Sequence, residues 1–372
     1  MTRLLASLLL LPALALADAP PPPAIAAKAW LLYDYTSAQV IISEKKDERF
    51  EPASLTKLMT AYLVFSELKQ KTLIPEKAVT VSERASMTAG SRMFIEPNKP
   101  VSVDELLRGM IVQSGNDACI ALAEAIAGSE EVFAQMMNRE AQRLGMKNTN
   151  FVNSSGLPDP KHYSTAHDLG LLAAALIRDF PEYYPLYSLR EYRYNNITQP
   201  NRNRLLWLDP NADGMKTGYT ENAGFCLIGS SKRGARRLLS VVLGANSDSA
   251  RVQESQKLLN YGFQFYDAVK LYGKDQAVST LEVLKGGENR VKAGFQSDFY
   301  VSVPRGIADQ VKADLISMQP LVAPVSVGQK VGTVKVTLQG KPLGEYPVVA
   351  LETVAIAGFF GRTWDGMRLW FK

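Results

Sequence analysis

The chain has 372 residues, more than one typical domain, and its 46% hydrophobic and 21% charged residues are ordinary for a globular protein with a large core. The formal net charge of +5 and the pI of 9.0 suit attraction to anionic lipid headgroups, although such a mild excess identifies no partner by itself. No internal repeat or long low-complexity tract is present, which excludes repeat architectures.

The first residues have the pattern of an export leader. A basic N-terminus precedes an apolar run from Leu4 to Leu16, whose end, Ala15-Leu16-Ala17, matches the small-x-small cleavage pattern. We therefore expect residues 1–17 to be a signal peptide, and residues 18–27 to be a Pro-rich linker that acts as a stiff spacer. Nucleic acid is not expected as a partner of an exported chain.

A buried helix is predicted from Leu55 to Phe65, after a β-hairpin formed by Ala29–Tyr33 and Gln39–Ile42. Ser54 and Lys57 stand three residues apart at the start of this helix, so their side chains share one helical face. A desolvated lysine has a lowered pKa and can take the proton of a serine hydroxyl. The pair is compatible with a serine nucleophile, although alone it is more typical of a helix cap beside a solvated lysine.

Neither the histidines nor the cysteines of the chain suggest a better catalytic or metal-binding site than the serine–lysine pair. His162 and His167 lie in a polar, Pro-containing loop without a carboxylate or thiol partner, so they are predicted to be surface residues, and we expect no metal and no cofactor. Cys119 and Cys226 each lie in an apolar element. We expect both to be buried free thiols, and Cys119 not to be a nucleophile.

A second motif, Ser114-Gly115-Asn116, is predicted to lie between two helices. Ser102 to Glu105 has the capping-box pattern that opens the first helix, and the second helix, which Asn116-Asp117 can cap, stops near Gly128. In such a short connection Ser114 can relay a proton to a leaving amine, and the Asn116 amide can hold a substrate carbonyl. An ordinary helix–helix turn would favour the same residues for backbone reasons.

A third motif, Lys216-Thr217-Gly218, opens a predicted strand that is followed by a turn over Thr220–Gly224 and a second strand over Phe225–Gly229. Gly218 would let a substrate backbone lie against the strand edge. Lys216 and Thr217 offer a positive charge and a hydroxyl to a carboxylate. A lysine on an edge strand is otherwise a common protection against aggregation.

The three motifs together carry a specific resemblance. With their flanks, Glu51–Thr60, Gln113–Cys119 and Asp213–Gly218, the chain resembles the low-molecular-mass penicillin-binding proteins that act as D-alanyl-D-alanine carboxypeptidases, over almost its whole length after the leader. The resemblance implies an α/β (α+β) fold, with a penicillin-binding and β-lactamase-like transpeptidase domain in which helices flank an antiparallel sheet. This domain is expected over residues 28–272.

The resemblance implies a serine-type carboxypeptidase that removes the terminal D-alanine from peptidoglycan stem pentapeptides. By this analogy Ser54 attacks the penultimate carbonyl, Lys57 takes its proton, and the backbone N–H groups of Ser54 and Tyr219 form the oxyanion hole. Ser114 and Lys216 would pass the proton to the departing amine, and water would deacylate the enzyme. The implied substrate-binding residues are Asn116, Lys216, Thr217, Gly218, Tyr219 and Arg251, of which Thr217 and Arg251 would hold the terminal carboxylate.

Penicillins imitate the same dipeptide, so β-lactam antibiotics are expected to acylate Ser54. Two departures from the family pattern limit this expectation to binding rather than turnover: Tyr219 stands where many relatives have histidine, and the segment from Ala85 to Arg92, which in the family influences deacylation, looks short. Glu96 has no context that supports a deacylation base. A dedicated β-lactamase is therefore disfavoured.

The pattern changes to strands after a boundary near Tyr272-Gly273, which follows an amphipathic helix carrying Val252, Leu259, Phe263 and Tyr266. Strands are predicted over Ala277–Leu284, Phe299–Val303, Thr333–Leu338 and Glu345–Leu351, which makes residues 273–353 a small β-rich domain. The family analogy makes this domain a spacer between the catalytic domain and the membrane.

Residues 354–372 are predicted to form an amphipathic helix on the membrane surface. The segment is too short and too charged to span a bilayer, but it can place Phe360, Trp364, Met367 and Phe371 on one side, with Arg362, Arg368 and Lys372 nearby. Packing of this tail on the second domain is the alternative. We expect an exported, peripheral protein at the periplasmic face of the cytoplasmic membrane.

Two other functions stay open at this point. A DD-endopeptidase that cuts peptidoglycan cross-links would use the same residues, because only the size of the leaving group differs. A catalytically silent peptidoglycan-binding or shape-maintaining protein would retain the fold without the reaction. The carboxypeptidase ranks first because all the motif residues are intact.

Overall fold

The computed structural model describes residues 19–358, which fold into two compact units. The N-terminal unit comprises Pro22–Gln264 together with Tyr300–Ser302. The β unit contains Phe265–Phe299 and residues 303–358. The predicted signal peptide, residues 1–17, and most of the predicted anchor, residues 354–372, lie outside the described residues.

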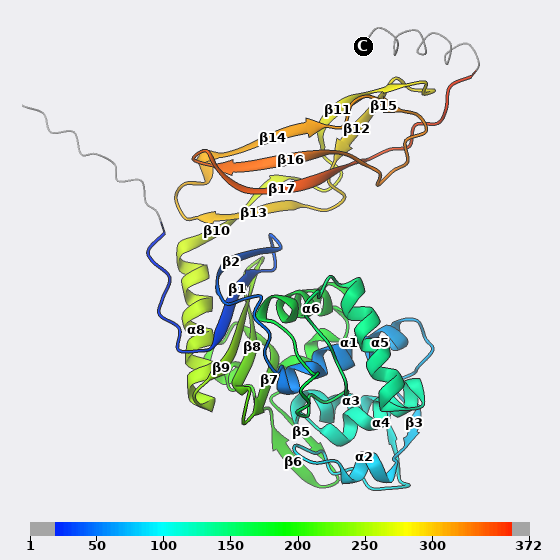
Figure 1. The fold of residues 1–372 in the computed structure, drawn as a ribbon, viewed down its shortest axis with the longest axis vertical. Coiled ribbons are helices and arrows are strands. Elements are labelled where there is room, and N and C mark those ends of the chain that lie inside the picture. The colour runs from blue at the N-terminus through cyan, green and yellow to red at the C-terminus, as the bar shows by residue number, and fades with distance from the viewer. Residues whose placement is uncertain (1–18, 359–372) are drawn as a thin grey trace, which may run out of the picture. The chain divides into compact units, whose positions relative to one another are not determined.

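The N-terminal unit is built on a five-stranded sheet with the strand order β2-β1-β9-β8-β7 (Figure 1). Every pairing in it is antiparallel, which confirms the predicted sheet and both predicted hairpins. Strand β7, which carries the third motif, lies at an edge of the sheet. The strands are β1 (Ala29–Asp34), β2 (Gln39–Glu44), β7 (Ala212–Thr220), β8 (Gly224–Arg233) and β9 (Arg236–Ala245).

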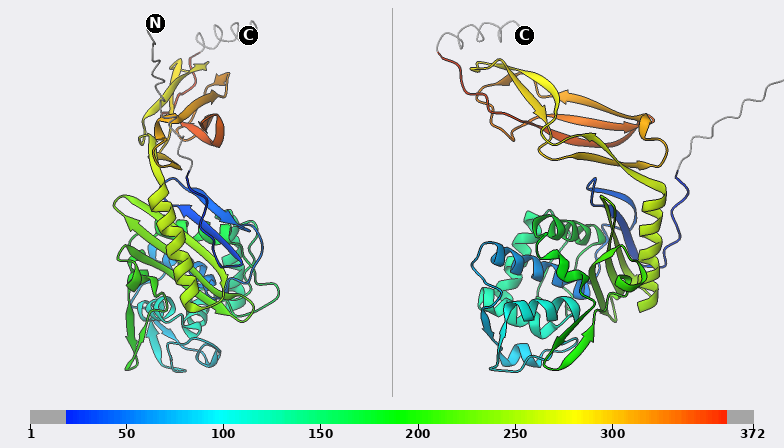
Figure 2. Two further views of the ribbon diagram at one scale, coloured as in Figure 1. Left: turned by 90° about the vertical axis from the view of Figure 1, so that its left-hand side faces the viewer. Right: turned by 180° about the vertical axis from the view of Figure 1, so that it is seen from behind.

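Helices flank this sheet on both faces, as predicted. Helix α8 (Asp248–Phe265) lies along one face and a larger helical group covers the other (Figure 2). Helix α1 (Lys57–Lys69) is buried at every position from Lys57 to Phe65, because its side chains are apolar nearly all round. The group also contains α2 (Glu83–Met87), α3 (Val103–Val112), α4 (Asn116–Ala127), α5 (Glu130–Arg143) and α6 (Ala166–Asp179).

Local capping signals fix where two of these helices begin and end. Ser102 and Glu105 form the predicted capping box at the start of α3, each side chain accepting a backbone N–H of the other residue. Helix α4 ends at Gly128, whose φ of 78° is the left-handed conformation that favours glycine. Its N-cap, however, is Gly115, so Asn116 is the first helical residue rather than the predicted cap.

Short elements complete the N-terminal unit around the helical group. Two small antiparallel ribbons pair β3 with β4 and β5 with β6. A one-turn helix, α7, precedes β7 and buries Leu205 and Leu206. The bounds are β3 (Ala78–Thr80), β4 (Pro100–Ser102), β5 (Glu191–Tyr194), β6 (Ile197–Pro200), α7 (Leu205–Leu208) and η2 (Tyr184–Ser188).

The β unit confirms the predicted β-rich domain. It contains a six-stranded sheet with the order β14-β16-β17-β12-β11-β15 and a separate pair, β10 and β13. The alternation predicted over Thr333–Leu338 is present, since Val334, Val336 and Leu338 are all buried. The strands are β10 (Tyr266–Tyr272), β11 (Ala277–Leu284), β12 (Arg290–Gly294), β13 (Phe299–Pro304), β14 (Val311–Ser317), β15 (Leu321–Val322), β16 (Lys330–Leu338) and β17 (Lys341–Ala350).

The unit boundary lies earlier than the sequence pattern indicated. The β unit begins at Phe265, not near Tyr272, because α8 ends there and Tyr266 already starts β10. Tyr266 continues the helical spacing of Val252, Leu259 and Phe263 by coincidence. Within the β unit an ion pair joins Asp267 to Arg305 at 3.1 Å.

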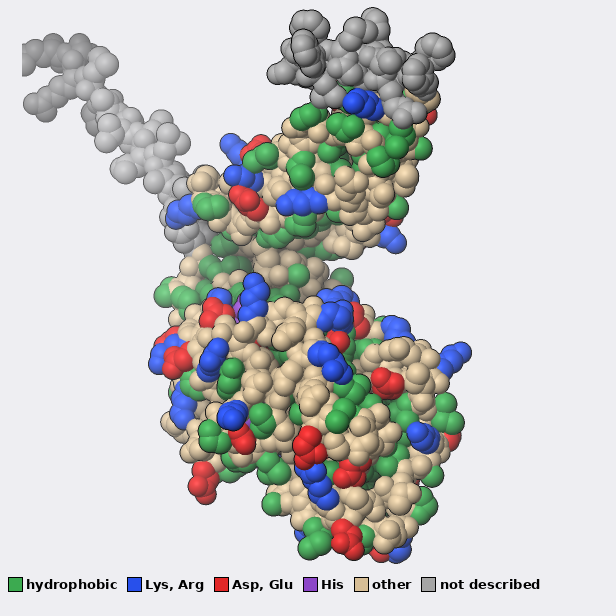
Figure 3. Space-filling view, turned by 45° about the vertical axis from the view of Figure 1, so that its right-hand side comes forward, with side chains coloured by type: hydrophobic (Ala, Val, Ile, Leu, Met, Phe, Trp, Pro, Cys, Tyr) green, Lys and Arg blue, Asp and Glu red, His purple; other side chains and the backbone are tan. Residues whose placement is uncertain are grey.

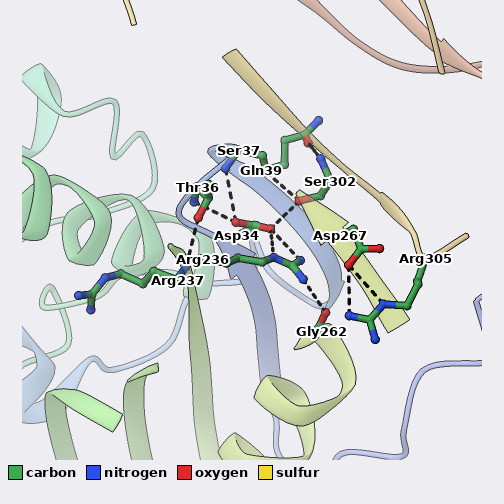
Figure 4. A network of polar contacts seen from close by, with 10 residues as sticks. All are labelled: Asp34, Thr36, Ser37, Gln39, Arg236, Arg237, Gly262, Asp267, Ser302 and Arg305. Atoms are coloured by element: carbon green, nitrogen blue, oxygen red, sulfur yellow. Dashed lines mark hydrogen bonds and ion pairs between the residues drawn. The ribbon is translucent and has the colours of Figure 1, made fainter. Parts of the chain in front are cut away.

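A buried carboxylate ties together several segments of the N-terminal unit (Figure 4). The Asp34 side chain is fully buried, and it accepts hydrogen bonds from Arg236 at 2.8 and 2.9 Å, from the Ser302 hydroxyl at 2.7 Å and from the Thr36 N–H at 2.9 Å. Arg236 also donates to the carbonyl of Gly262. One side chain thus links strands β1 and β9 and the turn after β1.

Replacement of this carboxylate is expected to destabilise the protein strongly. Asp34→Ala leaves the guanidinium of Arg236 in a largely buried place without its anionic partner, and removal of one member of a buried ion pair costs about 3–5 kcal/mol. Urea denaturation of the full chain measures the loss. The control is Asp47→Ala, because Asp47 is an exposed ion-pair partner whose removal changes stability by about 0–1 kcal/mol; equal effects of the two variants would contradict the assignment.

Basic and acidic side chains are interspersed on the face of the molecule shown in Figure 3. The net charge of +5 therefore does not collect into one basic surface on this face. On this face, mixed charges of this kind do not indicate the uniform positive potential that attracts a polyanion.

Candidate active site

The first motif lies in a short 3-10 turn, η1 (Ala53–Thr56), that leads directly into α1. Ser54 is therefore not the N-cap of the helix, and no capping hydrogen bond of its side chain is found there. The i, i+3 spacing still brings Ser54 and Lys57 together, with 2.9 Å between the lysine Nζ and the serine Oγ.

Lys57 is surrounded by oxygen atoms and has almost no contact with solvent. Its Nζ donates to Ser54 Oγ, to Asn116 Oδ1 at 2.7 Å and to the carbonyl of Ser155 at 2.7 Å. Burial lowers the pKa of Lys57, and the nearby Cys119 and Asp117 oppose that shift. Loss of one proton would leave two N–H groups for Asn116 and Ser155 and a lone pair that can accept the proton of Ser54.

A second serine–lysine pair faces the same region. Lys216 Nζ lies 2.9 Å from Ser114 Oγ and 3.0 Å from the carbonyl of Thr217, and the Lys216 side chain is buried. Burial, followed by the charges of Lys57 and Arg202, lowers the pKa of Lys216 well below its usual value. Two lysines with lowered pKa values in one site are a functional signature, because the fold gains no stability from burying them.

Asn116 holds the site together in this structure. Its Oδ1 accepts from Lys57 and its Nδ2 donates to the carbonyl of Ala89 at 2.7 Å, so both ends of the amide are engaged. The neighbouring Asp117 accepts from the backbone N–H groups of Met93 and Phe94 at 3.0 and 2.8 Å. Together these side chains fix the segment that follows α2 against the start of α4.

Gly218 is required by packing within the protein rather than by a substrate alone. A Cβ at this position would lie 3.1 Å from the carbonyl oxygen of Pro52 and 3.2 Å from the nitrogen of Ser54, tighter than nine in ten real Cβ contacts. The glycine thus lets β7 lie directly against the turn that carries Ser54. Thr217 is buried beside it, whereas Tyr219 is 53% exposed and packs its ring on Phe225.

A cavity of about 370 Å³ opens over these groups. Ser54, Asn116 and Tyr219 of the predicted set line it directly. Four segments supply the rest of the wall: the one after α2, the loop between α5 and α6, the segment between β6 and α7, and the end of β7. The lining residues are Ser54, Gly90, Ser91, Asn116, Ser155, Gly156, Leu157, Arg202, Tyr219 and Thr220.

The structure separates Arg251 from this cavity and brings Arg202 to it. Arg251 is buried under the sheet, where it donates to the carbonyls of Gly218 and Cys226 at 3.1 and 3.4 Å and pairs with Asp248. Arg202 lines the cavity and lowers the pKa values of both lysines, which places its charge near them. No motif in the sequence marks Arg202, Ser155 or Gly156, which long-range folding alone brings here.

The prediction that His162 is a surface residue is wrong. Its side chain is buried: Nδ1 accepts from the N–H of Val152 at 3.2 Å, which leaves the proton on Nε2 to be donated to Thr56 Oγ1 at 2.8 Å. The ring therefore joins the loop between α5 and α6 to the turn that carries Ser54. His167 lies on α6, where it pairs with Asp47, and both cysteines are buried free thiols as predicted. No group of metal-ligating side chains is present in residues 19–358.

The burial of His162 predicts a pH-dependent stability. Burial lowers the pKa of His162 to about 4, so between pH 6.5 and 4 the unfolded chain binds a proton that the folded chain excludes. Stability is therefore lost as the pH falls through this window, by about 1.4 kcal/mol per pH unit. The difference in unfolding free energy between the parent and His162→Gln is expected to shrink accordingly. A difference that stays constant, or the same trend in His167→Gln, would contradict this account.

Comparison with known proteins gives this arrangement a family. Residues 16–247 match the family model described as D-alanyl-D-alanine carboxypeptidase, and residues 266–355 match the model described as penicillin-binding protein 5, C-terminal domain. The chain is 44% identical over 357 residues to D-alanyl-D-alanine carboxypeptidase DacC of Escherichia coli (strain K12), an alignment that covers 94% of this chain and 89% of that protein.

Solved structures agree with the sequence comparison. Penicillin binding protein 5 from Haemophilus influenzae superposes with a TM-score of 0.84 at 40% identity, covering 90% of this chain and 99% of that one. Penicillin-binding protein D2 from Listeria monocytogenes, in its ampicillin-bound form, superposes with a TM-score of 0.61 at 31% identity, covering 66% of this chain and 100% of that one.

Proposed function

The chain belongs to the D-alanyl-D-alanine carboxypeptidase family and is a serine-type carboxypeptidase, and from this premise we propose that Ser54 is the nucleophile that cleaves peptidoglycan stem pentapeptides. The observation that carries the proposal is the 2.9 Å contact between Lys57 and Ser54, because Ser54 lines a cavity together with a cation, Arg202. This arrangement supplies a nucleophile, a base and a binding site for the terminal carboxylate of the peptide.

Acylation begins with transfer of the Ser54 hydroxyl proton to neutral Lys57. The serine oxygen then attacks the carbonyl carbon of the penultimate D-alanine, and the resulting oxyanion is held by the backbone N–H groups of Ser54 and Tyr219. Asn116 and the Ser155 carbonyl hold the lysine in place during this step, since both bond its Nζ at 2.7 Å. A substrate carbonyl bound to Asn116 would accept from its Nδ2, which already donates to the carbonyl of Ala89 at 2.7 Å.

Departure of the terminal D-alanine requires a proton on its nitrogen. Ser114 donates this proton as the C–N bond breaks, and Lys216, at 2.9 Å and in its protonated form, replaces it. The product is an ester on Ser54, and water hydrolyses it to regenerate the serine. The released D-alanine carries the amino group that forms when the amide bond breaks.

Recognition of the terminal carboxylate falls to the cationic end of the cavity. Lys216, the Thr217 hydroxyl and the exposed Arg202 guanidinium offer the donors, and a guanidinium matches a carboxylate with paired hydrogen bonds. Arg251 acts indirectly, because its Nη1 already donates to the carbonyls of Gly218 and Cys226 and its Nη2 pairs with Asp248. It therefore positions the strand that carries the third motif.

β-Lactam antibiotics are a second class of ligand in this proposal. They imitate the D-Ala-D-Ala dipeptide and would acylate Ser54 without releasing a leaving group. The ampicillin-bound relative from Listeria monocytogenes supports this assignment.

The location of the enzyme is also part of the proposal. Residues 1–17 would direct export to the periplasm, and the aromatic and basic residues after Gly358 would hold the protein at the surface of the cytoplasmic membrane. Within residues 19–358 no helix is long and apolar enough to cross a bilayer. Release by detergent and retention in high salt would support the apolar contact, whereas release by salt alone would oppose it.

The test uses the leader-free protein with a monomeric pentapeptide muropeptide. Mass spectrometry is expected to show loss of one D-alanine, and the variant Ser54→Ala is expected to release none. D-alanine release that persists in Ser54→Ala would contradict the assigned nucleophile. An inactive parent enzyme would instead leave a peptidoglycan-binding role as the leading explanation.

A further inference from the structure

A second cavity, of about 560 Å³, adjoins the catalytic cavity. Arg202 lines both, so the two cavities meet at this side chain. The segment between β6 and α7, α7 itself and the start of α8 form its walls. The lining residues are Pro200, Asn201, Arg202, Arg204, Trp207, Leu208, Asp248 and Arg251.

One wall of this cavity is apolar and open. Trp207 is 45% exposed and Leu208 is 56% exposed, although both lie on the one-turn helix α7, whose other residues, Leu205 and Leu206, are buried. The indole is thus held on a firmly packed element at the cavity wall, with the guanidinium of Arg190 over its ring at 5.9 Å from the ring centre. An exposed tryptophan in a concave place is a typical anchor for a ligand.

The other wall is cationic. Arg202, Arg204 and Arg251 line the cavity with a single carboxylate, Asp248, which is already paired with Arg251. The side chain of Arg204 makes no hydrogen bond or ion pair with any residue in the part of the chain that the structure describes. The cavity therefore suits a ligand with an anionic group and an apolar body.

The position of this cavity relates it to the leaving group of the proposed reaction. The departing amine lies beside Ser114 and Lys216, and its carboxylate is assigned above to the end of the catalytic cavity where Arg202 stands. The second cavity begins at that same guanidinium. A leaving residue with a side chain larger than a methyl group needs space beyond its carboxylate, and this cavity offers that space at the same arginine.

We propose that this cavity is a leaving-group subsite for residues larger than D-alanine that carry a carboxylate beside the departing amine. Arg202 holds the carboxylate, and Trp207 and Leu208 contact the side chain beyond it. The inference rests on the proposed function and extends its substrate class. Two sources share this chemistry: a bulky D-amino acid at the end of a stem peptide, and the D-centre of a diamino acid in a cross-linked second stem.

The reaction is unchanged with these substrates. The Ser54 oxygen forms an ester with the penultimate carbonyl carbon, the amide bond to the larger residue breaks, and its nitrogen takes the proton from Ser114. Water then hydrolyses the ester. Only the size and surroundings of the released amine differ.

The test compares three substrates that share one acyl portion: a stem pentapeptide ending in D-alanine, the same peptide ending in D-phenylalanine, and a cross-linked dimer. Trp207→Ala removes the apolar contact and Leu208→Trp fills the cavity. Both sites are exposed, so neither change disturbs the core. Met87→Ala is the control, since Met87 is 78% exposed and lies outside both cavities.

Both variants are expected to lower kcat/KM for a larger leaving group about tenfold and to leave D-alanine release within about twofold of the parent. A response with D-phenylalanine alone assigns the subsite to terminal D-residues, and a response with the dimer alone assigns it to cross-links. Equal effects on all three substrates, or a parent enzyme that releases only D-alanine, would overturn the proposal. Failure of the proposed function would be distinct, because D-alanine itself would not be released.

Discussion

Lys57→Arg is expected to lower kcat/KM for D-alanine release by at least about 10²-fold. A positioned general base contributes about 10²–10⁴-fold, and arginine cannot act as one because it stays protonated. The positive charge is retained, so the variant isolates proton transfer from simple electrostatics. Stopped-flow acylation by a penicillin measures the step directly.

The dependence on pH provides a second readout for Lys57. Burial lowers the pKa of this lysine, and only the neutral amine accepts a proton, so acylation by the parent is expected to rise with pH as Lys57 deprotonates. The variant should lack that rise. Lys69→Arg, an exposed change on the same helix, is the control and should behave as the parent does. Full activity in Lys57→Arg would eliminate Lys57 as the base.

Gly156→Ala is expected to damage both the fold and the site. The residue has a φ of 85°, and a Cβ there would lie 1.8 Å from the carbonyl oxygen of Ala53, beside the nucleophile. Relief of this clash must move Ser155, whose carbonyl binds Lys57, or the turn that carries Ser54. We expect a loss of more than about 2 kcal/mol of stability and at least about 100-fold in activity.

Gly128→Ala is the matched control for this substitution. Gly128 has a similar φ of 78°, but a Cβ there would meet nothing within 4 Å. It should lose about 1 kcal/mol of stability from backbone strain alone and keep its activity. Similar activity losses in the two variants would show that backbone strain, not contact with the serine turn, decides the effect.

Local patterns predicted much of the fold because their causes are local. The capping box at Ser102, the stop at Gly128 and the alternation in β16 each depend on a few neighbouring residues. The order of the three motifs was specific enough to identify the family, which the comparisons confirm. The end of α8 was misjudged because Tyr266 happens to continue a helical spacing into a strand.

The parts that sequence reasoning missed depend on contacts between distant segments. His162 is buried because Thr56, more than one hundred positions earlier, bonds its ring. Arg202 and Ser155 reach the site through the packing of loops that carry no motif. Gly218 is needed by the serine turn as well as by a substrate, a contact that only the folded backbone reveals.

The contacts between distant segments matter because they give two buried lysines of one site fixed hydrogen-bond partners. Lys57 and Lys216 are 1% and 3% exposed, and burial of an amine favours its neutral form. Asn116 and the Ser155 carbonyl give Lys57 fixed partners, and Ser114 and the Thr217 carbonyl do the same for Lys216. Burial of these two amines lowers the stability of the fold, and the packing of the surrounding core compensates for that loss.

The most direct test of the account is the position of the acyl group. The protein is treated with penicillin and digested with trypsin, and the peptides are mapped by mass spectrometry. The account predicts one penicilloyl group on the peptide spanning residues 50–57, at Ser54, and none in Ser54→Ala. An adduct on the peptide that contains Ser114, or D-alanine release by an enzyme that forms no adduct, would contradict it.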